Sequence, residues 1–536
     1  MRHNSLLSYA EATKTLTLKQ KVGQLFMPAV FINDSEEDIL KMEDLIRTNS
    51  IGAICFFHSR ASAATNFEGK KKVIHNDDSY TRLKQLISRY QKTAAFPLLV
   101  AIDAEWGLAM RVEKTPRYPY AITLGAIQGN NDLIFAIGKQ IALDCKEAGI
   151  HWNLAPVIDI NNNPENPVIG YRAFGDDKDI VCRKSEAYLE GMKSMGVLGA
   201  LKHFPGHGDT ATDSHLELPI INKSKEELME NELHPYQKLI RKGVDAVMVG
   251  HLSIPELDSE NPSTTSSKII TDLLRKAMNF EGVVISDALN MHAVSKMYPK
   301  KGMLETNAFA AGMDMMCFSE HAEEGIEEIM ASASEKRIEE SFKRVWKLKE
   351  RAFSSFSEKE NPNSKLSSEL NKKIAEHSIT ERYGNPNDIE EVKTNDFLNL
   401  SLSNQSTNRF SVKIEEHFGQ KHHQLDIPTM EMIKGKVLGY ENVVLALFPP
   451  SIKPKNKFGT NETILEFIQT LINKKSVLIY LFGNPYMLDT LQLKSNTNVV
   501  VVYQDFKEFQ EVAYDHFSGQ KEARGKLPIT LKTHHV

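Results

Sequence analysis

The stretch Val197–Phe204 reads V-L-G-A-L-K-H-F, an apolar run that ends in a lysine, a histidine and a phenylalanine. Similar runs, bounded by turn-forming residues, recur along the chain as far as residue 318. They are Ile51–Phe57, Leu98–Asp103, Ile150–Ile160, Val244–His251, Val283–Asp287 and Met313–Phe318. Strands that are buried on both faces of a parallel sheet have this near-continuous apolar character. The runs therefore predict a parallel sheet.

Amphipathic helical stretches separate these runs, and the alternation of strand and helix predicts an α/β fold. The helical stretches include Asp132–Ala148, Lys178–Met195, Lys225–Lys242, Thr271–Met278 and Ile338–Phe353. Both a closed (β/α)8 barrel and a doubly wound sheet fit this alternation. The barrel is favoured because polar side chains end or follow several different runs, and barrel active sites are built at the carboxyl ends of the strands. These polar residues are Asp103, Lys202, His203, His251 and Asp287.

A polar stretch that contains Pro362 divides the chain into two parts. Beyond it, four further apolar runs alternate with helical stretches, which indicates a second α/β domain. These runs are Phe397–Leu402, Val437–Phe448, Val477–Phe482 and Val499–Tyr503. We therefore predict a (β/α)8 TIM-type catalytic barrel over residues 1–355, a linker over 356–370 and a smaller C-terminal α/β sandwich domain over 371–536.

Charge and composition narrow the class of partner. The net charge is −5 with no long block of one sign, so neither nucleic acid nor an anionic membrane surface is expected as a partner. The four cysteines lie far apart and none forms a C-x-x-C pair, which indicates buried thiols in a reducing compartment. The sequence has no apolar run long enough to span a membrane, and residues 1–20 lack the apolar core of a signal peptide. We expect a cytoplasmic protein that binds a small ligand.

The densest polar segment is K-H-F-P-G-H-G-D-T-A-T-D-S-H, residues 202–215. A solvated loop is one interpretation of it. A metal site is a second, although no H-E-x-x-H or similar ligand spacing supports it. Acid–base chemistry is a third, because the Asp213 carboxylate can orient the His215 imidazole and favour its charged form.

Asp287 ends the apolar run V-V-I-S-D, where a barrel would present a catalytic group. The same residue precedes a stretch that can begin a helix, so Asp287 could equally cap that helix. The segment by itself favours neither reading.

Three motifs taken together resemble glycoside hydrolase family 3, and more narrowly its β-N-acetylglucosaminidase branch, the NagZ type. They are K-H-F-P-G-H-G-x-x-x-x-D-S-H, S-D-x-L-x-M at residues 286–291 and D-x-E-x-G-x-x-x-R at Asp103–Arg111. The stretch Ala310–Met316, A-A-G-M-D-M-M, is similar to the last-strand signature of the family. The resemblance covers residues 17 to about 355. Phe482–Tyr486 is one of several C-terminal stretches that are similar to the second domain of longer members.

The resemblance implies that Asp287 is the nucleophile, that His215 is the general acid/base and that Asp213 is the partner of His215. It also implies a set of residues around the sugar, which are Asp103, Arg111, Arg172, Lys202 and His203. Neither a cofactor nor a metal ion is implied. A small saccharide that ends in β-linked N-acetylglucosamine is the implied partner, and the oligomeric state is left open.

The implied activity is that of a retaining exo-β-N-acetylglucosaminidase, a β-N-acetylhexosaminidase that acts on oligosaccharides or on the muropeptides of peptidoglycan recycling. Two alternatives stay open: a β-N-acetylglucosaminide phosphorylase, and a catalytically silent carbohydrate-binding barrel. Trp106 stands where the family usually has glycine, and Ala288 stands where an aspartate often follows the nucleophile. Both departures bear on the specificity for the sugar.

Overall fold

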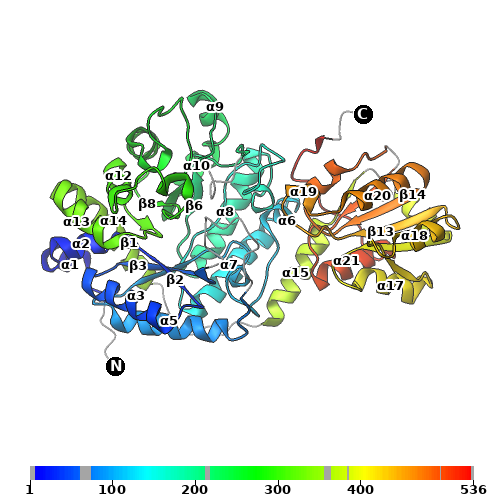
Figure 1. Cartoon of the computed structure of the whole chain (residues 1–536), viewed down its shortest axis with the longest axis horizontal. Helices are drawn as coiled ribbons and strands as arrows, with labels where there is room; N and C mark the ends of the chain where they lie inside the picture. Colours follow the sequence, from blue (N-terminus) through cyan, green and yellow to red (C-terminus); the bar gives the residue numbers. More distant parts are fainter. Residues whose placement is uncertain are drawn as a thin grey trace. The chain divides into compact units, whose positions relative to one another are not determined.

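The computed structural model of the chain describes residues 6–60, 74–211, 218–354, 364–382, 386–494 and 497–532. The chain divides into two units that are interleaved along the sequence (Figure 1). The first unit contains Met1–Tyr118, Ile134–Ile160 and Val181–Ser364. The second contains Pro119–Leu133, Asn161–Ile180 and Lys365–Val536.

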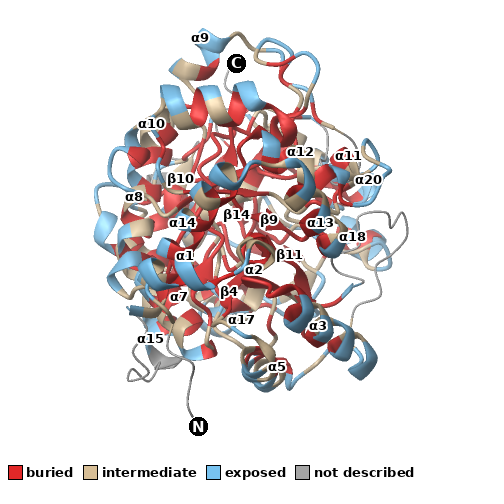
Figure 2. Cartoon of the chain, turned by 90° about the vertical axis from the view of Figure 1, so that its left-hand side faces the viewer, coloured by how far each residue is buried: buried red, intermediate tan, exposed pale blue. Residues whose placement is uncertain are grey.

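Short parallel strands form the centre of the first unit. They are β1 (Phe26–Met27), β2 (Ala29–Phe31), β3 (Ala53–Phe57), β4 (Leu99–Ile102), β5 (Trp152–Asn153), β6 (Leu201–Phe204), β7 (Ala246–Val249), β8 (Val283–Ser286) and β9 (Met316–Cys317). Each apolar run that predicted a strand in this unit contains one of these strands, so the prediction of parallel strands is confirmed. In Figure 2 the strands are buried, while helices such as α3 and α5 have exposed outer faces.

The strands pair with their neighbours in sequence order. One parallel set is β2-β3-β4-β5 and another is β6-β7-β8. Single parallel bridges, from Trp152 to Leu198 and from Ile285 to Met315, extend the pairing between β5 and β6 and between β8 and β9. Strand β9 pairs in turn with β1. Because neighbouring strands all run in the same direction, their carboxyl ends lie at one edge of the pairing.

Helices connect and cover these strands. They are α1 (Tyr9–Thr15), α2 (Leu18–Gly23), α3 (Glu36–Asn49), α5 (Ser79–Thr93), η1 (Leu108–Met110), α7 (Asn131–Ala148), α8 (Lys178–Ser194), α9 (Lys225–Glu230), α10 (His234–Ile240), η3 (Ser263–Thr265), η4 (Lys268–Ala277), α11 (His292–Ser295), α12 (Met303–Ala311), α13 (Ala322–Ser332) and α14 (Glu335–Ser354). The predicted helix over Lys225–Lys242 is in fact two helices. Asn231 leaves the helical region of backbone angles with φ −116° and ψ −80°, and Pro235 near the start of α10 has no N–H to donate.

Asp314 is a buried anchor just before β9 in the first unit. Its carboxylate accepts hydrogen bonds from Ser341 Oγ (2.6 Å), Arg344 Nη1 (3.1 Å) and the backbone N–H of Val284 (3.0 Å). Arg275 also donates to it. A fully buried carboxylate is tolerated only when opposite charges and hydrogen bonds compensate it. Asp314 therefore ties β8, η4 and α14 to the end of the strand series.

The second unit is built on a mixed sheet with the strand order β10-β15-β14-β13-β11-β12, in which only the pair β10-β15 is antiparallel among the described strands. These strands are β10 (Thr380–Arg382), β11 (Phe397–Leu402), β12 (His422–Gln424), β13 (Asn442–Leu447), β14 (Ser476–Leu481) and β15 (Asn498–Val501). The accompanying helices are α6 (Ala121–Gly125), η2 (Gly170–Arg172), α15 (Ser364–Ser378), α16 (Pro386–Thr394), α17 (Arg409–Phe418), α18 (Met430–Val437), α19 (Lys455–Phe458), α20 (Glu462–Lys474), η5 (Pro485–Thr490) and α21 (Lys507–Phe517).

Two early segments of the chain pack into the core of this second unit. Ile122 and Ala126 belong to the same buried cluster as the sheet residues. The side chain of Gln504 donates to Thr123 Oγ1 (2.7 Å), and the backbone N–H of Lys526 donates to the Ala126 carbonyl (2.9 Å). Gly125 lies so close to Phe174 that a Cβ would stand 1.7 Å from its carbonyl oxygen. The second unit therefore includes residues from three separate stretches of the sequence.

The predicted boundaries at residues 355 and 371 stay a prediction. Residues 356–363 of the predicted linker lie outside the described residues, and α15 begins at Ser364. Within the described ranges, the structure contains no helix that is both long and apolar enough to cross a membrane.

Lys349 on α14 is a buried base that makes stability depend on pH. Its Nζ donates to Gln24 Oε1 (2.6 Å) and lies 5.1 Å from the centroid of the Trp346 ring. Burial lowers the pKa of Lys349 from 10.5 to about 7. Above pH 7 the unfolded chain therefore binds more protons than the folded one, so this group makes the free energy of unfolding rise with pH.

We expect Lys349→Met to remove this pH dependence. Between pH 7 and about pH 10 the free energy of unfolding of the parent should rise relative to the variant by up to about 1.4 kcal/mol per pH unit. Urea unfolding at a series of pH values measures the difference. Lys347→Met, at an exposed position on the same helix, is the control and should follow the parent. Parallel curves for the parent and Lys349→Met would contradict the assignment.

Candidate active site

A buried cluster of charges joins the carboxyl ends of β4 and β6. Lys202 on β6 is 2% exposed, and its Nζ lies 2.8 Å from Asp103 Oδ1 and 2.8 Å from Glu105 Oε1. The other oxygen of Asp103, Oδ2, accepts a hydrogen bond from Arg111 Nη2 (2.9 Å). Burial raises the pKa of Asp103, but the charges of Lys202 and Arg111 outweigh it, and the net pKa lies below the ordinary value. Asp103 is therefore an ionised acceptor between two cations.

Arg111 also stacks against an aromatic ring, since its guanidinium carbon lies 5.1 Å from the centroid of Phe57 on β3. Both the Phe57 ring and the hydrogen bond to Asp103 hold the planar guanidinium. Asp103, Arg111 and Lys202 were all predicted as sugar-binding residues, and the structure brings them together.

A second buried carboxylate, Asp159, organises the histidines of the same segment. It accepts hydrogen bonds from His203 Nδ1 (2.7 Å), from the backbone N–H of His203 (3.2 Å) and from the backbone N–H of His207 (2.7 Å). His207 Nδ1 is in turn 2.8 Å from Thr210 Oγ1. Burial lowers the pKa of His207 to about 4, with His203 as a further cause, so His207 is neutral at pH 7.

Asp287 comes directly after β8 and is partly exposed. Its backbone N–H donates to the Val249 carbonyl on β7 (2.9 Å), and its Oδ1 accepts the N–H of Ala288 (2.7 Å). The neighbouring His251 donates from Nε2 to the Ala288 carbonyl (2.9 Å) and is fully buried. These contacts fix the backbone of Asp287 at the carboxyl edge of the strands.

The charges of Asp103 and Asp287 both affect the pKa of one thiol, that of Cys317 at the end of β9. A hydrogen bond with Cys55 and burial raise the pKa of the Cys317 thiol, and the charges of Asp103 and Asp287 raise it further. The backbone N–H of Leu289, two residues after Asp287, donates to the Cys317 carbonyl (3.0 Å), and Cys55 pairs on β3 with Ala101, two residues before Asp103. The predicted nucleophile and the predicted sugar-binding cluster thus lie in the same part of the first unit.

The remaining predicted residues are placed differently. Asp213 and His215 lie outside the described residues. Arg172 belongs to the second unit, where it ends η2 and donates from Nη1 to the Val168 carbonyl (3.2 Å).

Sequence reasoning missed Glu105 and Asp159 as site residues. The alternation D-A-E after β4 could have indicated Glu105, because residues two apart in an extended segment point to the same side. Asp159 is an acidic residue inside the apolar run Ile150–Ile160, and a carboxylate in such a run requires buried partners.

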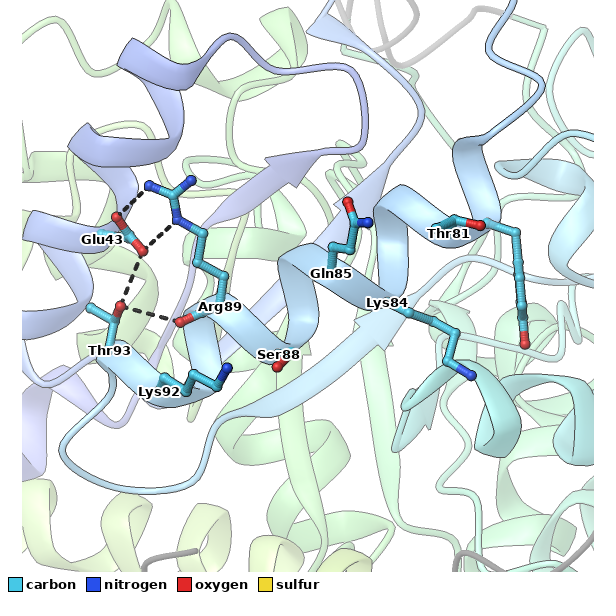
Figure 3. A pocket seen from close by; sticks show the side chains of 9 residues that line it. Glu43, Thr81, Lys84, Gln85, Ser88, Arg89, Lys92 and Thr93 are labelled. Atoms are coloured by element: carbon cyan, nitrogen blue, oxygen red, sulfur yellow. Dashed lines mark hydrogen bonds and ion pairs between the residues drawn. The ribbon is translucent and has the colours of Figure 1, made fainter. Parts of the chain in front are cut away.

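A groove on the first unit is lined by other residues. It has a volume of about 830 Å³ and lies along α5 beside α3, where Arg89 pairs with Glu43 (Figure 3). Its lining residues are Glu43, Tyr80, Thr81, Lys84, Gln85, Ser88, Arg89, Lys92 and Thr93. None of the predicted site residues that the structure describes lines it. Within the described ranges, no group of three or more His, Cys, Asp or Glu side chains is arranged to hold a metal ion.

Comparison with known proteins assigns the chain to a family. The profile of the Glycosyl hydrolase family 3 N terminal domain matches residues 17–348, which include β1 to β9 and the whole charged cluster. The chain belongs to glycosyl hydrolase family 3. This confirms the resemblance that the sequence motifs indicated.

Curated relatives place this family 3 chain beside the β-hexosaminidase branch. Beta-hexosaminidase A of Pseudoalteromonas piscicida is 32% identical over 292 residues, which are 51% of this chain and 47% of that protein. Beta-hexosaminidase of Psychromonas ingrahamii is 35% identical over 243 residues, which are 44% of this chain and 70% of that protein. The match with the first of these relatives thus spans about half of its length.

A solved structure extends the likeness to both units of this family 3 member. It is the structure of a glycoside hydrolase family 3 beta-N-acetylglucosaminidase from Paenibacillus sp. str. FPU-7. Its sequence is 26% identical, the TM-score is 0.77, and the alignment covers 96% of this chain and 99% of that one.

We expect Asp159→Asn to destabilise the protein, because Asp159 is a buried acceptor for three N–H groups of the loop. The amide cannot carry the charge, and its NH₂ group would face donors. The free energy of unfolding should fall by roughly 2–4 kcal/mol, measured by urea unfolding at pH 7. Asp44→Asn, which breaks an exposed ion pair with Arg47, is the control and should stay within about 0.5 kcal/mol of the parent. An equally small effect at Asp159 would show that the loop does not depend on this carboxylate.

Proposed function

We propose that the chain is a retaining exo-β-N-acetylglucosaminidase that releases terminal β-linked N-acetylglucosamine from oligosaccharides or muropeptides. The observation that carries this proposal is the cluster of Asp103, Lys202 and Arg111, which lies in the same part of the first unit as Asp287. Family membership and the names of the β-hexosaminidase relatives support the choice of sugar.

The proposed scaffold is a (β/α)8 barrel followed by a C-terminal α/β sandwich domain. The succession of parallel pairs from β2 to β8, together with the pair β1-β9, supports the barrel. In such a barrel the carboxyl ends of the strands carry the catalytic groups. Asp103 after β4, Lys202 on β6 and Asp287 after β8 are consistent with this arrangement.

The proposed chemistry proceeds by two displacements at the anomeric carbon. The Asp287 carboxylate attacks this carbon while His215 protonates the departing oxygen, which gives a covalent glycosyl-aspartate. His215 then takes a proton from water, and the water oxygen attacks the same carbon and displaces Asp287. Two inversions retain the β configuration. Asp213 orients the imidazole and stabilises its charged form.

The charged cluster supplies both kinds of hydrogen-bonding group that a sugar requires. The ionised Asp103 accepts from hydroxyl groups, while Arg111 and Lys202 donate to sugar oxygens. His203 is the neighbouring candidate, held by Asp159. For Arg172, which belongs to the second unit, sugar binding stays a prediction that rests on the sequence resemblance alone. No cofactor or metal ion takes part in the proposed reaction.

The substrate is tested by comparing an aryl β-N-acetylglucosaminide with the matching aryl β-glucoside, each with and without inorganic phosphate. We expect kcat/KM to favour the N-acetyl sugar by roughly tenfold or more, because its acetamido group adds polar contacts. The rate should not depend on phosphate, and the product should be the free sugar. Equal kcat/KM values would refute the N-acetyl assignment. A rate that requires phosphate, with a sugar phosphate as product, would identify a phosphorylase instead.

The role of Asp287 is tested with two substitutions that separate a nucleophile from a helix cap. Asp287→Asn and Asp287→Ser should both fold and both lose on the order of 10³-fold or more in kcat, because neither side chain supplies the carboxylate. Serine is a good capping residue, so Asp287→Ser would keep its activity if Asp287 only capped the following turn. Steady-state kinetics on the aryl substrate distinguish the two roles, and melting temperatures check the fold.

A further inference from the structure

Lys223, which follows the segment of Asp213 and His215 in the sequence, forms two ion pairs in the first unit. Its Nζ is 2.8 Å from Asp209 Oδ2 and 2.6 Å from Glu232 Oε1. Asp209 precedes this segment in the sequence and Lys223 follows it. The ion pair between them therefore joins the two ends of the stretch 210–222.

The second partner of Lys223, Glu232, is buried, which distinguishes this pair of contacts from an ordinary surface ion pair. Its side chain is 1% exposed, and its carboxylate also accepts a hydrogen bond from Asn231 (3.3 Å). A buried carboxylate needs a nearby cation, which holds Lys223 in place. Burial lowers the pKa of Lys223, but the hydrogen bonds to Asp209 and Glu232 outweigh it and raise the net pKa, so Lys223 is charged at neutral pH. Exposed pairs of two long side chains lack such an anchor and contribute little.

The residues that precede Asp209 are also held by buried contacts. Gly206 has a φ of +134°, and a Cβ at this position would stand 2.8 Å from Glu232 Cβ. The following residue, His207, donates its backbone N–H to buried Asp159. The chain therefore enters the stretch between two buried carboxylates, of which Glu232 also binds Lys223.

The second end of the stretch is fixed to the loop after β7. The backbone N–H of Ile221 donates to the Ser253 carbonyl (2.9 Å), and the N–H of Ser253 donates to the Pro219 carbonyl (2.8 Å). Lys223 follows two residues later. Both ends are thus held by described contacts, and the ion pair between Asp209 and Lys223 links them directly.

We propose that the ion pair between Asp209 and Lys223 is a clasp that positions the acid/base residues Asp213 and His215 for proton transfer. This inference rests on the proposed function, in which His215 protonates the leaving group. Joining the ends of a chain segment limits the conformations that lie between them. A proton donor misplaced by about 1 Å loses much of its effect, so a loosened segment weakens the acid before it affects the nucleophile. Asp209 and Lys223 are positioning residues, since they act through His215.

The test uses Asp209→Asn in the full-length protein. This change breaks the link to the stretch and leaves the ion pair between Lys223 and Glu232 intact, so the protein should fold. Asp272→Asn is the matched control, because it breaks another lysine–aspartate pair of 2.8 Å at an exposed position on η4. Lys223→Arg keeps a cation that can reach both carboxylates.

Two measurements are made on each variant. Hydrogen exchange of peptides from residues 210–222 reports on the segment without reference to activity. The second measurement is kcat/KM for an aryl β-N-acetylglucosaminide with an acidic phenol and for a β-linked disaccharide of N-acetylglucosamine. The disaccharide needs protonation of its leaving oxygen and the acidic phenol does not. His215→Ala gives the full size of this leaving-group effect.

Asp209→Asn should speed exchange within 210–222 and lower kcat/KM on the disaccharide by about tenfold, with less than about threefold loss on the aryl substrate. Lys223→Arg and Asp272→Asn should resemble the parent in both measurements. Unchanged exchange in Asp209→Asn would overturn the clasp, whatever the activity. Faster exchange with equal losses on both substrates would overturn its role in positioning the acid. If the parent protein hydrolyses neither substrate, the proposed function is refuted, and the role of the ion pair in positioning the acid is refuted with it. Faster exchange in Asp209→Asn would then still support the physical link between the two ends of the stretch.

Discussion

The buried ammonium group of Lys202 is the interaction on which the proposed site depends. Its two carboxylate partners, Asp103 and Glu105, come from the segment after β4, while Lys202 itself lies on β6. Lys202 is buried and its two carboxylate partners are partly buried, so the opposite charges compensate one another, and removing one partner would weaken this compensation. The cluster therefore fixes the separation of two strand ends and at the same time provides charged groups for a polar ligand. Arg111, which stacks on Phe57, extends the same compensation to β3.

Asp159 also holds part of β6 in place, but through hydrogen bonds to N–H groups instead of an ion pair with a lysine. It accepts backbone and ring N–H groups of His203 and His207, so it shapes the chain more than it balances charge. Lys202 and His203 are adjacent in sequence but belong to separate networks, one centred on Asp103 and the other on Asp159. Strand β6 is thus held by the carboxylates of Asp103 and Asp159, which come from two different segments. This arrangement gives the following turn at Gly206 a rigid starting point.

Much of the fold could be predicted because buried parallel strands are almost entirely apolar, as at Val283–Ser286 and Ala246–Val249. The clustering of Asp103 and Lys202 was also predictable, since each is a polar residue at or just after a buried strand, whereas Arg111 was predicted from the resemblance to the family. The strand β12 was missed because His422, His423 and Gln424 are partly exposed at a sheet edge and form no apolar run. Asp159 was missed because two of its three hydrogen-bond partners are backbone N–H groups, which a sequence does not display. The interleaving of the two units also escaped sequence analysis, because it depends on contacts such as that between Thr123 and Gln504.

The interleaved construction of the second unit has a consequence for synthesis on the ribosome. Residues 119–133 and 161–180 leave the ribosome early, whereas the sheet strands that complete their core, such as β13 and β14, are made much later. Ile122 and Ala126 are therefore buried in their final cluster only after β13 and β14 have been made. A nascent chain exposes this apolar surface for many seconds at about 5–20 residues per second, and such surface is where chaperones bind. The second unit can be completed only after these later strands have been synthesised, although its first segments are made long before them.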